Sequence, residues 1–331
     1  MSQINRQIKV EKFTSPEEGA SFCQEKIGSP APEELLIRTQ YAPINPADLN
    51  VIEGKYGKLP LLPSIIGNEG SGQVIDTGES CKGFAKGDHV FYVNRNDCWQ
   101  DYVRVHPNQV IKVPESLSPK LGAMLKVNPA TAWLLLNQIE YKEPDSWIVQ
   151  NASNSGVGIA IIEIAKLMGW KTINFVRRTD LKAQLINYGA DLVVSDDEDG
   201  KNEAIEAIGK DLVSLAINAV GGDSALRIMS LLSEGGTHVT YGAMAKRPLK
   251  VPNSFLIFKD LRIQGFWLSK WLNSTSPQAM ERVYGKLADM MIHQKLHQPI
   301  DSILRPEEIK SAIKRSMQTG RDGKVLLDFS S

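Results

Sequence analysis

The stretch WIVQNASNSGVGIAIIEIAKLMGW, residues 147–170, decides how the chain is interpreted. It begins as a short apolar strand, passes through a turn of small residues and continues as a long apolar helix, which is the layout of a dinucleotide-binding turn. In the register GxGxxG the glycine positions fall on Ser153, Ser155 and Gly158, so only the last one matches. Serine is small, however, and its hydroxyl can donate to a phosphate. The stretch therefore predicts a degenerate phosphate-binding turn at a helix N-terminus.

The end of the next strand predicts which dinucleotide the turn binds. An NAD enzyme usually carries Asp or Glu about 20 residues beyond the turn, where it binds the ribose 2′-hydroxyl. Here that region holds Arg177, Arg178 and Thr179. Two guanidinium groups can bind a 2′-phosphate, whereas a carboxylate would repel it. A solvated pair of surface arginines is the alternative interpretation. The sequence predicts NADPH as the cofactor.

Composition excludes several classes of partner. The 331 residues include 38 basic and 38 acidic side chains, and this balance argues against nucleic acid or an anionic membrane as a partner. Cys23, Cys81 and Cys98 lie far apart without a CxxC spacing, which indicates a reducing compartment without a disulfide framework. The first residues lack the features of a signal or transit peptide, and no run of 18 apolar residues appears. We therefore expect a cytoplasmic protein that does not span a membrane.

The chain changes character near residue 116. Before it, short apolar runs separated by glycine and proline predict a small barrel-like β domain, with one short helix near 46–54. Beyond it, strands alternate with helical segments, which indicates a parallel sheet covered by helices on both faces. The strand expected at 323–329 returns to complete the first domain. The predicted strands of the two parts are 35–40, 71–78, 88–93, 101–105 and 109–113, and then 146–151, 171–176, 191–196, 212–220 and 237–243.

The segment PSIIGNEGSGQV, residues 63–74, resembles the medium-chain dehydrogenase/reductase superfamily. In the zinc enzymes of that superfamily a GHE motif supplies a metal-binding His, and here Asn68 stands in its place. Asparagine is a poor zinc ligand. The cysteine ligand expected near NPAD (45–48) and the four-cysteine lobe are also missing. The five histidines, His89, His106, His238, His293 and His297, show no ligand spacing. The last two lie four residues apart in a helix-like segment and are interpreted as surface residues. We expect no metal, so that a hydrogen-bond donor or general acid must stabilise charge on the substrate.

Within that superfamily the chain is similar to mitochondrial-type 2-enoyl thioester reductases along nearly its whole length. The stretches that carry the resemblance are NPADLNVIEGKYG (45–57), LPSIIGNEG (62–70), VNPATAW (127–133), QNASNSGVG (150–158), TINFVRR (172–178) and GFWLSKW (265–271). The resemblance implies a doubly wound Rossmann α/β domain over residues 121–299 and a GroES-like β-barrel catalytic domain over 1–120 with 300–331. It also implies a homodimer that reduces trans-2-enoyl-CoA or enoyl-acyl-carrier-protein with NADPH in fatty acid metabolism.

The same resemblance implies the site residues. Tyr56 is the expected proton donor, after hydride addition to the β-carbon; a turn tyrosine between Gly54 and Gly57 is the alternative. Lys126 replaces a residue that is usually small, and the sequence gives no account of it. The expected cofactor contacts are Asn128, Asn154, Ser155, Gly156, Val157, Arg177, Arg178, Tyr241, Gly242, Ala243, Met244, Phe266, Trp267, Leu268, Ser269 and Lys324. Phe266 and Trp267 are alternatively core aromatics, and Lys324 alternatively only begins a strand.

Two other functions stay open at this point. A zinc-free NADPH:quinone reductase of the same superfamily also places a tyrosine at the position of Tyr56. An NADPH-binding protein without turnover would not need that tyrosine. The apolar stretch 254–266 is the expected lining for an acyl chain, and the basic residues that flank it are expected either to meet a substrate's phosphates or carrier protein or to be solvated: Lys246, Arg247, Lys250, Lys259 and Arg262.

Overall fold

The computed structural model describes residues 3–137 and 146–330, and these divide into two compact units. The first unit runs to Val127 and resumes at Leu272, and the second comprises Asn128–Trp271. Helix α11 (Pro277–Ile292) therefore belongs to the first unit, whereas the sequence predicted a nucleotide domain that extends to residue 299. The reason is packing: the ring of Tyr284 on α11 meets Phe91 edge-on, with centroids 4.9 Å apart.

No helix of the described residues is long and apolar enough to cross a membrane.

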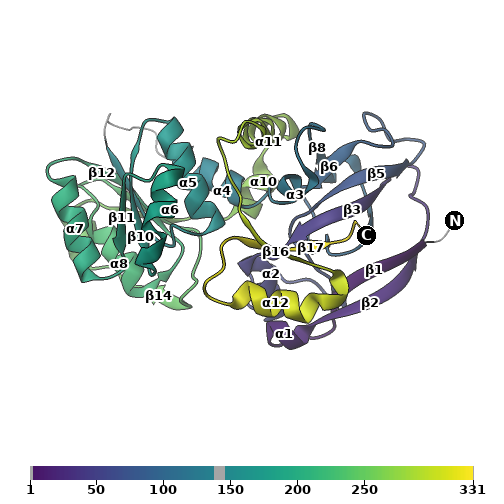
Figure 1. The fold of residues 1–331 in the computed structure, drawn as a ribbon, viewed down its shortest axis with the longest axis horizontal. Coiled ribbons are helices and arrows are strands. Elements are labelled where there is room, and N and C mark those ends of the chain that lie inside the picture. Colours follow the sequence, from purple (N-terminus) through teal and green to yellow (C-terminus); the bar gives the residue numbers. More distant parts are fainter. Residues whose placement is uncertain (1–2, 138–145, 331) are drawn as a thin grey trace. The chain divides into compact units, whose positions relative to one another are not determined.

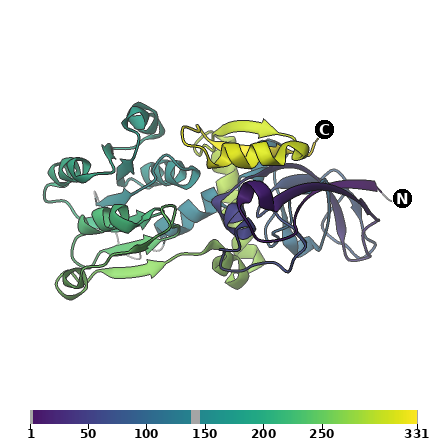
Figure 2. The same cartoon turned by 90° about the horizontal axis from the view of Figure 1, so that it is seen from below.

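The first unit is built on two sheets. The larger sheet has the order β16-β17-β3-β5-β6-β8, with β7 paired to β3. The predicted return of the C-terminal strand is confirmed, because β17 pairs antiparallel with β3. Figure 2 shows α12 (Ile309–Met317) in yellow beside the C-terminal strands. The strands are β3 (Leu35–Pro43), β5 (Ser71–Thr77), β6 (His89–Tyr92), β7 (Tyr102–Val105), β8 (Val110–Lys112), β16 (Ile300–Leu304) and β17 (Lys324–Asp328).

The smaller sheet was not anticipated from the sequence. It has the order β2-β1-β4 and is made mainly by the hairpin of β1 (Gln3–Val10) and β2 (Ala20–Ile27), with β4 (Ser64–Ile65) at the edge of β1. The short helix expected near 46–54 is α2 (Pro46–Ile52). Two further short helices of this unit are α1 (Pro16–Gly19) and α3 (Pro119–Ala123).

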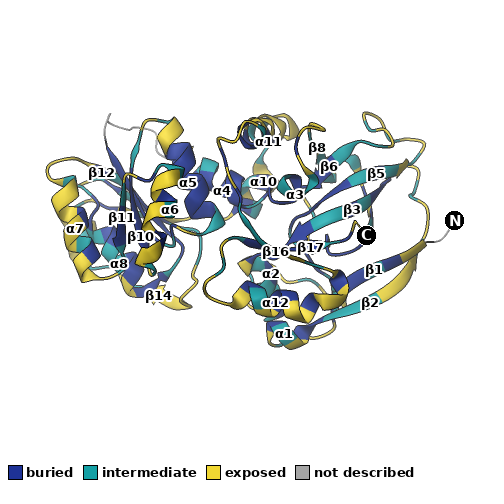
Figure 3. Ribbon diagram, viewed as in Figure 1, coloured by how far each residue is buried: buried dark blue, intermediate teal, exposed yellow. Residues whose placement is uncertain are grey.

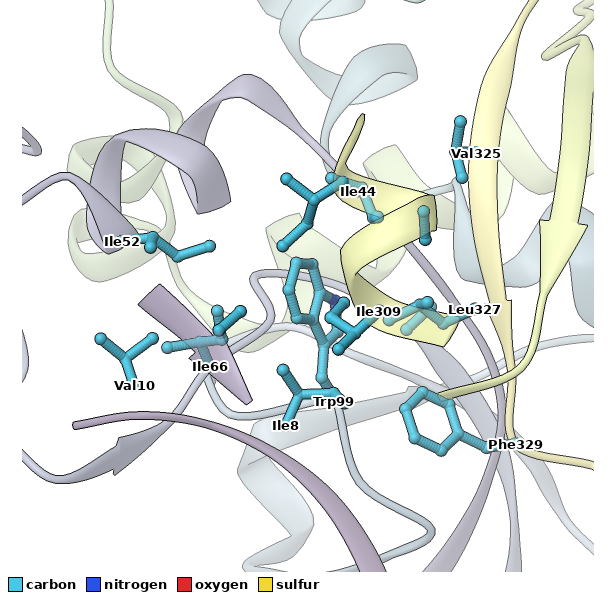
Figure 4. Packing of buried hydrophobic residues seen from close by; sticks show 14 residues of the cluster. Ile8, Val10, Ile44, Ile52, Ile66, Trp99, Ile309, Val325, Leu327 and Phe329 are labelled. Atoms are coloured by element: carbon cyan, nitrogen blue, oxygen red, sulfur yellow. The ribbon is translucent and has the colours of Figure 1, made fainter. Parts of the chain in front are cut away.

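Trp99 organises the core between the hairpin and the C-terminal segment. Its ring is fully buried and is surrounded by aliphatic side chains from β1, α2 and α12, as Figure 4 shows. Phe329, also fully buried, closes the same cluster. Gly67 lies against this indole: its φ is +116°, and a Cβ there would lie 2.3 Å from Cδ1 of Trp99. A glycine is thus required where the chain passes the largest core side chain.

The second unit is a single parallel sheet with helices, as the alternation of strands and helices predicted. Its order is β11-β10-β9-β12-β13-β15, and every neighbouring pair is parallel. The strands are β9 (Trp147–Gln150), β10 (Lys171–Val176), β11 (Leu192–Ser195), β12 (Val213–Asn218), β13 (Thr237–Thr240) and β15 (Arg262–Gly265), of which Figure 1 labels β10, β11 and β12. Because β9 lies at the centre and the order reverses there, this is the doubly wound arrangement.

The helices of this unit differ in how deeply they are buried. Helix α5 (Gly156–Leu167) is buried over most of its length, whereas α7 (Glu198–Ile208) presents a broad exposed face (Figure 3). This follows from sequence, since α5 is apolar nearly all round and α7 is charged on one side. The remaining elements are α4 (Asn128–Asn137), α6 (Lys182–Tyr188), α8 (Gly222–Ser230), β14 (Arg247–Leu249), α9 (Asn253–Ile257) and α10 (Leu268–Ser274). Residues 138 and 139, which end the helical run expected from the sequence, lie outside the described residues.

The contact of Gly67 with Trp99 gives a test of the core. Gly67→Ala places a methyl group too close to the indole ring of Trp99, and the alanine must also adopt the positive φ of this position. We expect a loss of about 2–4 kcal/mol in the free energy of unfolding. Urea denaturation measures this loss. Gly83→Ala is the matched control, because Gly83 also has a positive φ, of +83°, but its Cβ would meet nothing within 4 Å. Equal losses in the two variants would show that backbone strain, and not the contact with Trp99, is the constraint.

Candidate active site

In the second unit, the two serines of the turn hold its shape. Ser153 is fully buried, and its hydroxyl lies 3.2 Å from the carbonyl oxygen of Phe175 on β10 and 3.3 Å from that of Gln150. The hydroxyl is therefore used inside the protein, and the expectation that a serine here donates to phosphate does not hold for Ser153. Ser155 caps α5, since its Oγ accepts from the N–H of Gly158 at 3.1 Å. A Cβ on Gly158 would lie 2.5 Å from the carbonyl oxygen of Ser153, so the one retained glycine is required by close packing.

The start of α5 fits a pyrophosphate. Asn154 is exposed, and it precedes a helix of 12 residues whose first turn includes Gly156 and Val157. Ala152 holds the left-handed conformation, with φ of 50°, that lets the chain turn sharply into this helix. The N-terminus of a buried helix concentrates backbone N–H donors and the positive end of the helix dipole. The predicted contacts Asn154 to Val157 therefore lie together at the N-terminus of α5, which is a place that could hold an anion.

The segment Tyr241–Met244 reaches the same end of the sheet. The N–H of Tyr241 donates to the carbonyl of Asn218 at 3.0 Å, and that of Met244 donates to Ala219 at 2.9 Å. Burial raises the pKa of Tyr241, while the neighbouring Ser155 hydroxyl lowers it. The tyrosine hydroxyl and the helix cap thus lie next to each other, although the two residues are far apart in the sequence. A Cβ added to Gly242 would lie 3.0 Å from the carbonyl oxygen of Ala219, so the backbone passes close to that residue. Ala243 is exposed.

The predicted arginines follow β10 directly but differ in their surroundings. Arg178 makes a two-point ion pair with Asp180, with Nε to Oδ1 at 3.2 Å and Nη2 to Oδ2 at 2.6 Å. Arg177 is exposed. Because both groups of the pair are solvent-accessible, it contributes little to stability. The guanidinium group of Arg178 therefore already donates two hydrogen bonds to the carboxylate of Asp180.

The remaining predicted contacts of this unit flank the sheet. Phe266 follows β15, where its N–H donates to the carbonyl of Thr240 at 2.9 Å. Trp267 is 43% exposed, which excludes the alternative of a core aromatic for this residue, whereas Leu268 is buried and Ser269 half-buried. Asn128 begins α4 and is buried.

The first unit contains a buried group of charged side chains that the sequence did not reveal as a group. Asp48 and Glu69 are 2% and 0% exposed, and Lys126 and Lys324 are 3% and 9% exposed. Asn45 joins them: its Nδ2 donates to Glu69 at 2.7 Å, and its Oδ1 accepts from the Lys324 amino group. Two acidic and two basic side chains are thus buried together, so that groups of opposite charge lie near one another in the interior. We call these five residues the buried charge cluster.

Hydrogen bonds tie the buried charge cluster to four segments of chain. The Asp48 carboxylate accepts from the N–H of Asn45 and from that of Asn68, both at 2.8 Å, and thereby caps α2 and holds the loop before β5. Glu69 accepts from the N–H of Val127 at 2.9 Å. Burial raises the pKa of Asp48 to about 7 and lowers that of Lys324 to about 8. A sequence signal existed, since Asn45 and Asp48 flank Pro46 at the spacing of a capping pair.

The predicted proton donor follows the helix that this cluster caps. Tyr56 is half-buried in the loop after α2, beyond Gly54, whose φ is +70° and whose Cβ would lie 3.0 Å from Phe13. Lys324, predicted as a cofactor contact, is in the same unit with its amino group on Asn45. The structure thus places Tyr56 and Lys324 in the first unit and the other predicted contacts in the second.

Asn68, which stands in place of the zinc-binding His, is held by a lysine. Asn68 accepts from the amino group of Lys126 through both its main-chain and side-chain oxygens. Among the described residues, no group of three or more His, Cys, Asp or Glu side chains could hold a metal ion. Burial lowers the pKa of His238, on β13, to about 4, so this histidine is neutral. Cys23, Cys81 and Cys98 are free thiols.

Comparison with known proteins agrees with this architecture. The family model described as "Alcohol dehydrogenase GroES-like domain" matches residues 31–115, and the one described as "Zinc-binding dehydrogenase" matches residues 156–284. Relatives named "Enoyl-[acyl-carrier-protein] reductase, mitochondrial" include proteins of Rattus norvegicus and Dictyostelium discoideum. The first is 42% identical over 86% of this chain and 78% of its own length. The second is 34% identical over 98% of this chain and 95% of its own length.

Solved structures give the same picture. A structure of the Etr1p/NADP/crotonyl-CoA complex has a TM-score of 0.90 at 25% identity, and covers 98% of this chain and 100% of that one. A putative NADPH:quinone reductase from Bacillus thuringiensis has a TM-score of 0.91 at 22% identity and covers 98% and 99%. The latter shows the fold alone.

Fold and site together define an oxidoreductase of the medium-chain dehydrogenase/reductase superfamily. Within that superfamily the chain belongs to the family of the enoyl-[acyl-carrier-protein] reductases, because the relatives of that name exceed 30% identity over most of the chain. The family expected from the sequence is therefore confirmed, and the chain is an enzyme of the enoyl reductase type.

One expectation is wrong. The relatives are named mitochondrial, which overturns the expected cytoplasmic location. That expectation rested on the composition of the first residues, but Gln3–Val10 form strand β1 of the fold. Residues whose composition is set by packing in a sheet carry no information about the compartment.

The raised pKa of Asp48 predicts a pH dependence of stability. The native state holds this proton more tightly than the unfolded chain, in which the pKa is ordinary. As pH rises from about 4 to about 7, Asp48 therefore lowers the free energy of unfolding. Asparagine cannot titrate, so the Asp48→Asn variant should gain stability relative to wild type across this range, as measured by urea denaturation. The control is Asp76→Asn at an exposed carboxylate, for which we expect a constant difference. A constant difference for Asp48→Asn as well would contradict the raised pKa.

Proposed function

We propose that this protein reduces trans-2-enoyl thioesters, carried by CoA or an acyl carrier protein, to saturated acyl thioesters with NADPH, in fatty acid metabolism. The observation that carries the proposal is the pairing of two features in one chain: an arginine pair after β10 and a tyrosine in the loop after the capped helix α2. The names of the relatives support it, and so does the solved complex of Etr1p with NADP and crotonyl-CoA. The NADP in that complex agrees with the predicted cofactor.

When bound, NADPH supplies the hydride. The first turn of α5 binds the pyrophosphate through its N–H groups and the helix dipole. Arg177 and Arg178 bind the 2′-phosphate, with Asp180 competing for the second guanidinium. The other proposed cofactor contacts are Asn128, Tyr241 to Met244, Phe266 to Ser269 and Lys324.

Tyr56 is the proposed acid. The thioester carbonyl withdraws electrons through the double bond, so that the β-carbon accepts the hydride and the electrons of the double bond move toward the carbonyl oxygen. The tyrosine hydroxyl then gives its proton to the α-carbon, and the phenolate regains a proton from water. The substrate thus gains one hydride and one proton, which is a two-electron reduction.

Substitution of Tyr56 tests the acid. NADPH oxidation with crotonyl-CoA, followed at 340 nm, should fall by about 10²–10⁴-fold in kcat for Tyr56→Phe, because that is the usual contribution of a general acid. The KM for NADPH should stay near the wild-type value. The control is Tyr102→Phe on β7, for which we expect no change.

The same assay separates the alternatives. Turnover of a simple quinone without crotonyl-CoA reduction would make the protein a quinone reductase. An unchanged kcat for Tyr56→Phe with the thioester would remove the tyrosine from the mechanism. NADPH binding without turnover of either substrate would contradict the enzymatic proposal.

The arginine pair predicts the choice between NADPH and NADH. Arg177→Ala should raise the KM for NADPH about tenfold or more, since a hydrogen bond to a charged group contributes about 1.5–3 kcal/mol. Arg178→Ala should raise it less, because that guanidinium exchanges one anion, Asp180, for another. Neither variant should change the KM for NADH. The control is Lys182→Ala, an exposed cation on α6. Equal changes for both cofactors would show that the pair does not bind the 2′-phosphate.

We infer that the protein acts as a homodimer. One solved relative, at 25% identity and with a TM-score of 0.89, is an Etr1p/Etr2p heterodimer. Light scattering in solution measures the mass, and a monomeric mass would contradict this inference.

A further inference from the structure

Lys126 is a buried amine whose donors are all used. It is 3% exposed, and its Nζ donates to the main-chain oxygen of Asn68, to Oδ1 of Asn68 at 3.2 Å and to the main-chain oxygen of Arg95 at 3.0 Å. An ammonium group has three N–H donors and no acceptor. Three oxygens surround it and, among the described residues, no donor does, which is the hydrogen bonding of the protonated form. Burial lowers the pKa of this amine, and Cys98, Glu69 and Asp48 oppose that shift.

This arrangement determines how the Asn68 side chain is turned. A carboxamide has one end that accepts and one end that donates, and an ammonium group can face only the accepting end. Oδ1 therefore lies on Lys126, and the two N–H bonds of Nδ2 are directed away from it. The backbone N–H of Asn68 is held by Asp48 at 2.8 Å, so the residue is anchored at both its main chain and its side chain. Asn68 is half-buried. The oxygen end of the carboxamide is thus fixed on Lys126, and Nδ2 is the opposite end of the same group.

The same anchor connects Asn68 with the segment that carries Tyr56. The second oxygen of Asp48 accepts from the N–H of Asn45 and caps α2, and the loop with Tyr56 follows directly on this helix. One buried carboxylate thus sets the positions of both segments. Hydride addition to an enoyl thioester moves negative charge onto the thioester oxygen, and a fixed N–H donor stabilises such charge.

Building on the proposed function, we propose that Lys126 is a positioning residue that holds the Asn68 carboxamide with Nδ2 as hydrogen-bond donor to the thioester oxygen of the substrate. The ammonium group also polarises the amide, which strengthens the N–H donor. Asn68 and Lys126 together then do electrostatically what a Lewis acid would do. Tyr56 keeps its separate task of delivering the proton to the α-carbon.

The first variant removes the donor without changing charge. Asn68→Ala leaves the buried charge cluster balanced, and we expect kcat with crotonyl-CoA to fall by about 10²-fold, the usual effect of losing one oxyanion donor. The KM for NADPH should stay at the wild-type value. If Asn68→Ala retains the wild-type kcat while wild type reduces crotonyl-CoA, the inference is wrong and the proposed function stands. If wild type does not reduce crotonyl-CoA, the proposed function fails, and the inference fails with it.

The second variant tests positioning through a double-mutant cycle. Lys126→Met has a similar length but no donor, and it should lower kcat about tenfold or more in wild type yet add nothing in the Asn68→Ala background. A purely structural lysine would instead lower the melting temperature, leave kcat per folded molecule unchanged, and act equally in both backgrounds. The control is Lys9→Met, which removes a lysine paired with Glu25 on the N-terminal hairpin and should leave kcat unchanged. If Lys126→Met does not fold, the result for Asn68→Ala alone decides whether the donor exists.

Discussion

The burial of two carboxylates with two amines is the constraint on which the first unit depends. Asp48, Glu69, Lys126 and Lys324 come from four separate segments, and none of them can be left alone in the interior without a large desolvation cost. Because each charge needs its partners, the cap of α2, the loop before β5, the residues before α4 and the start of β17 must come together. The C-terminal strand is thus held to the N-terminal part by electrostatics as well as by the core around Trp99.

The second unit uses uncharged groups for the same purpose. A glycine-rich turn gains its shape from the absence of side chains, whereas here Ser153 and Ser155 fix the turn with their hydroxyl groups. Of the three glycine positions only Gly158 is a glycine, because a Cβ there would lie 2.5 Å from the carbonyl oxygen of Ser153. Serine in place of glycine is therefore compatible with a phosphate-binding turn, because the first backbone N–H groups of α5 still point out of the N-terminal end of the helix.

The sequence predicted elements well where the pattern was local. The five strands predicted before residue 116 and the five predicted after it are all present, since short apolar runs between turn formers encode strands directly. The hairpin of β1 and β2 was missed, because its exposed positions break the apolar pattern. The expected extent of the nucleotide domain differs from the observed unit for another reason: helical periodicity says that α11 is amphipathic but not which unit its apolar face covers.

By itself, the sequence determined the doubly wound sheet, the degenerate turn and the arginine pair, because each is written in neighbouring residues whose chemistry acts locally. It also singled out Asn68 as the residue in place of a metal ligand. Only the tertiary structure showed which side chain contacts Asn68. The amino group of Lys126 meets Asn68 from 58 residues away in sequence, and Lys324 meets Asn45 from 279 residues away. Such pairings follow from the charge balance of a folded interior, which no periodicity in the sequence expresses.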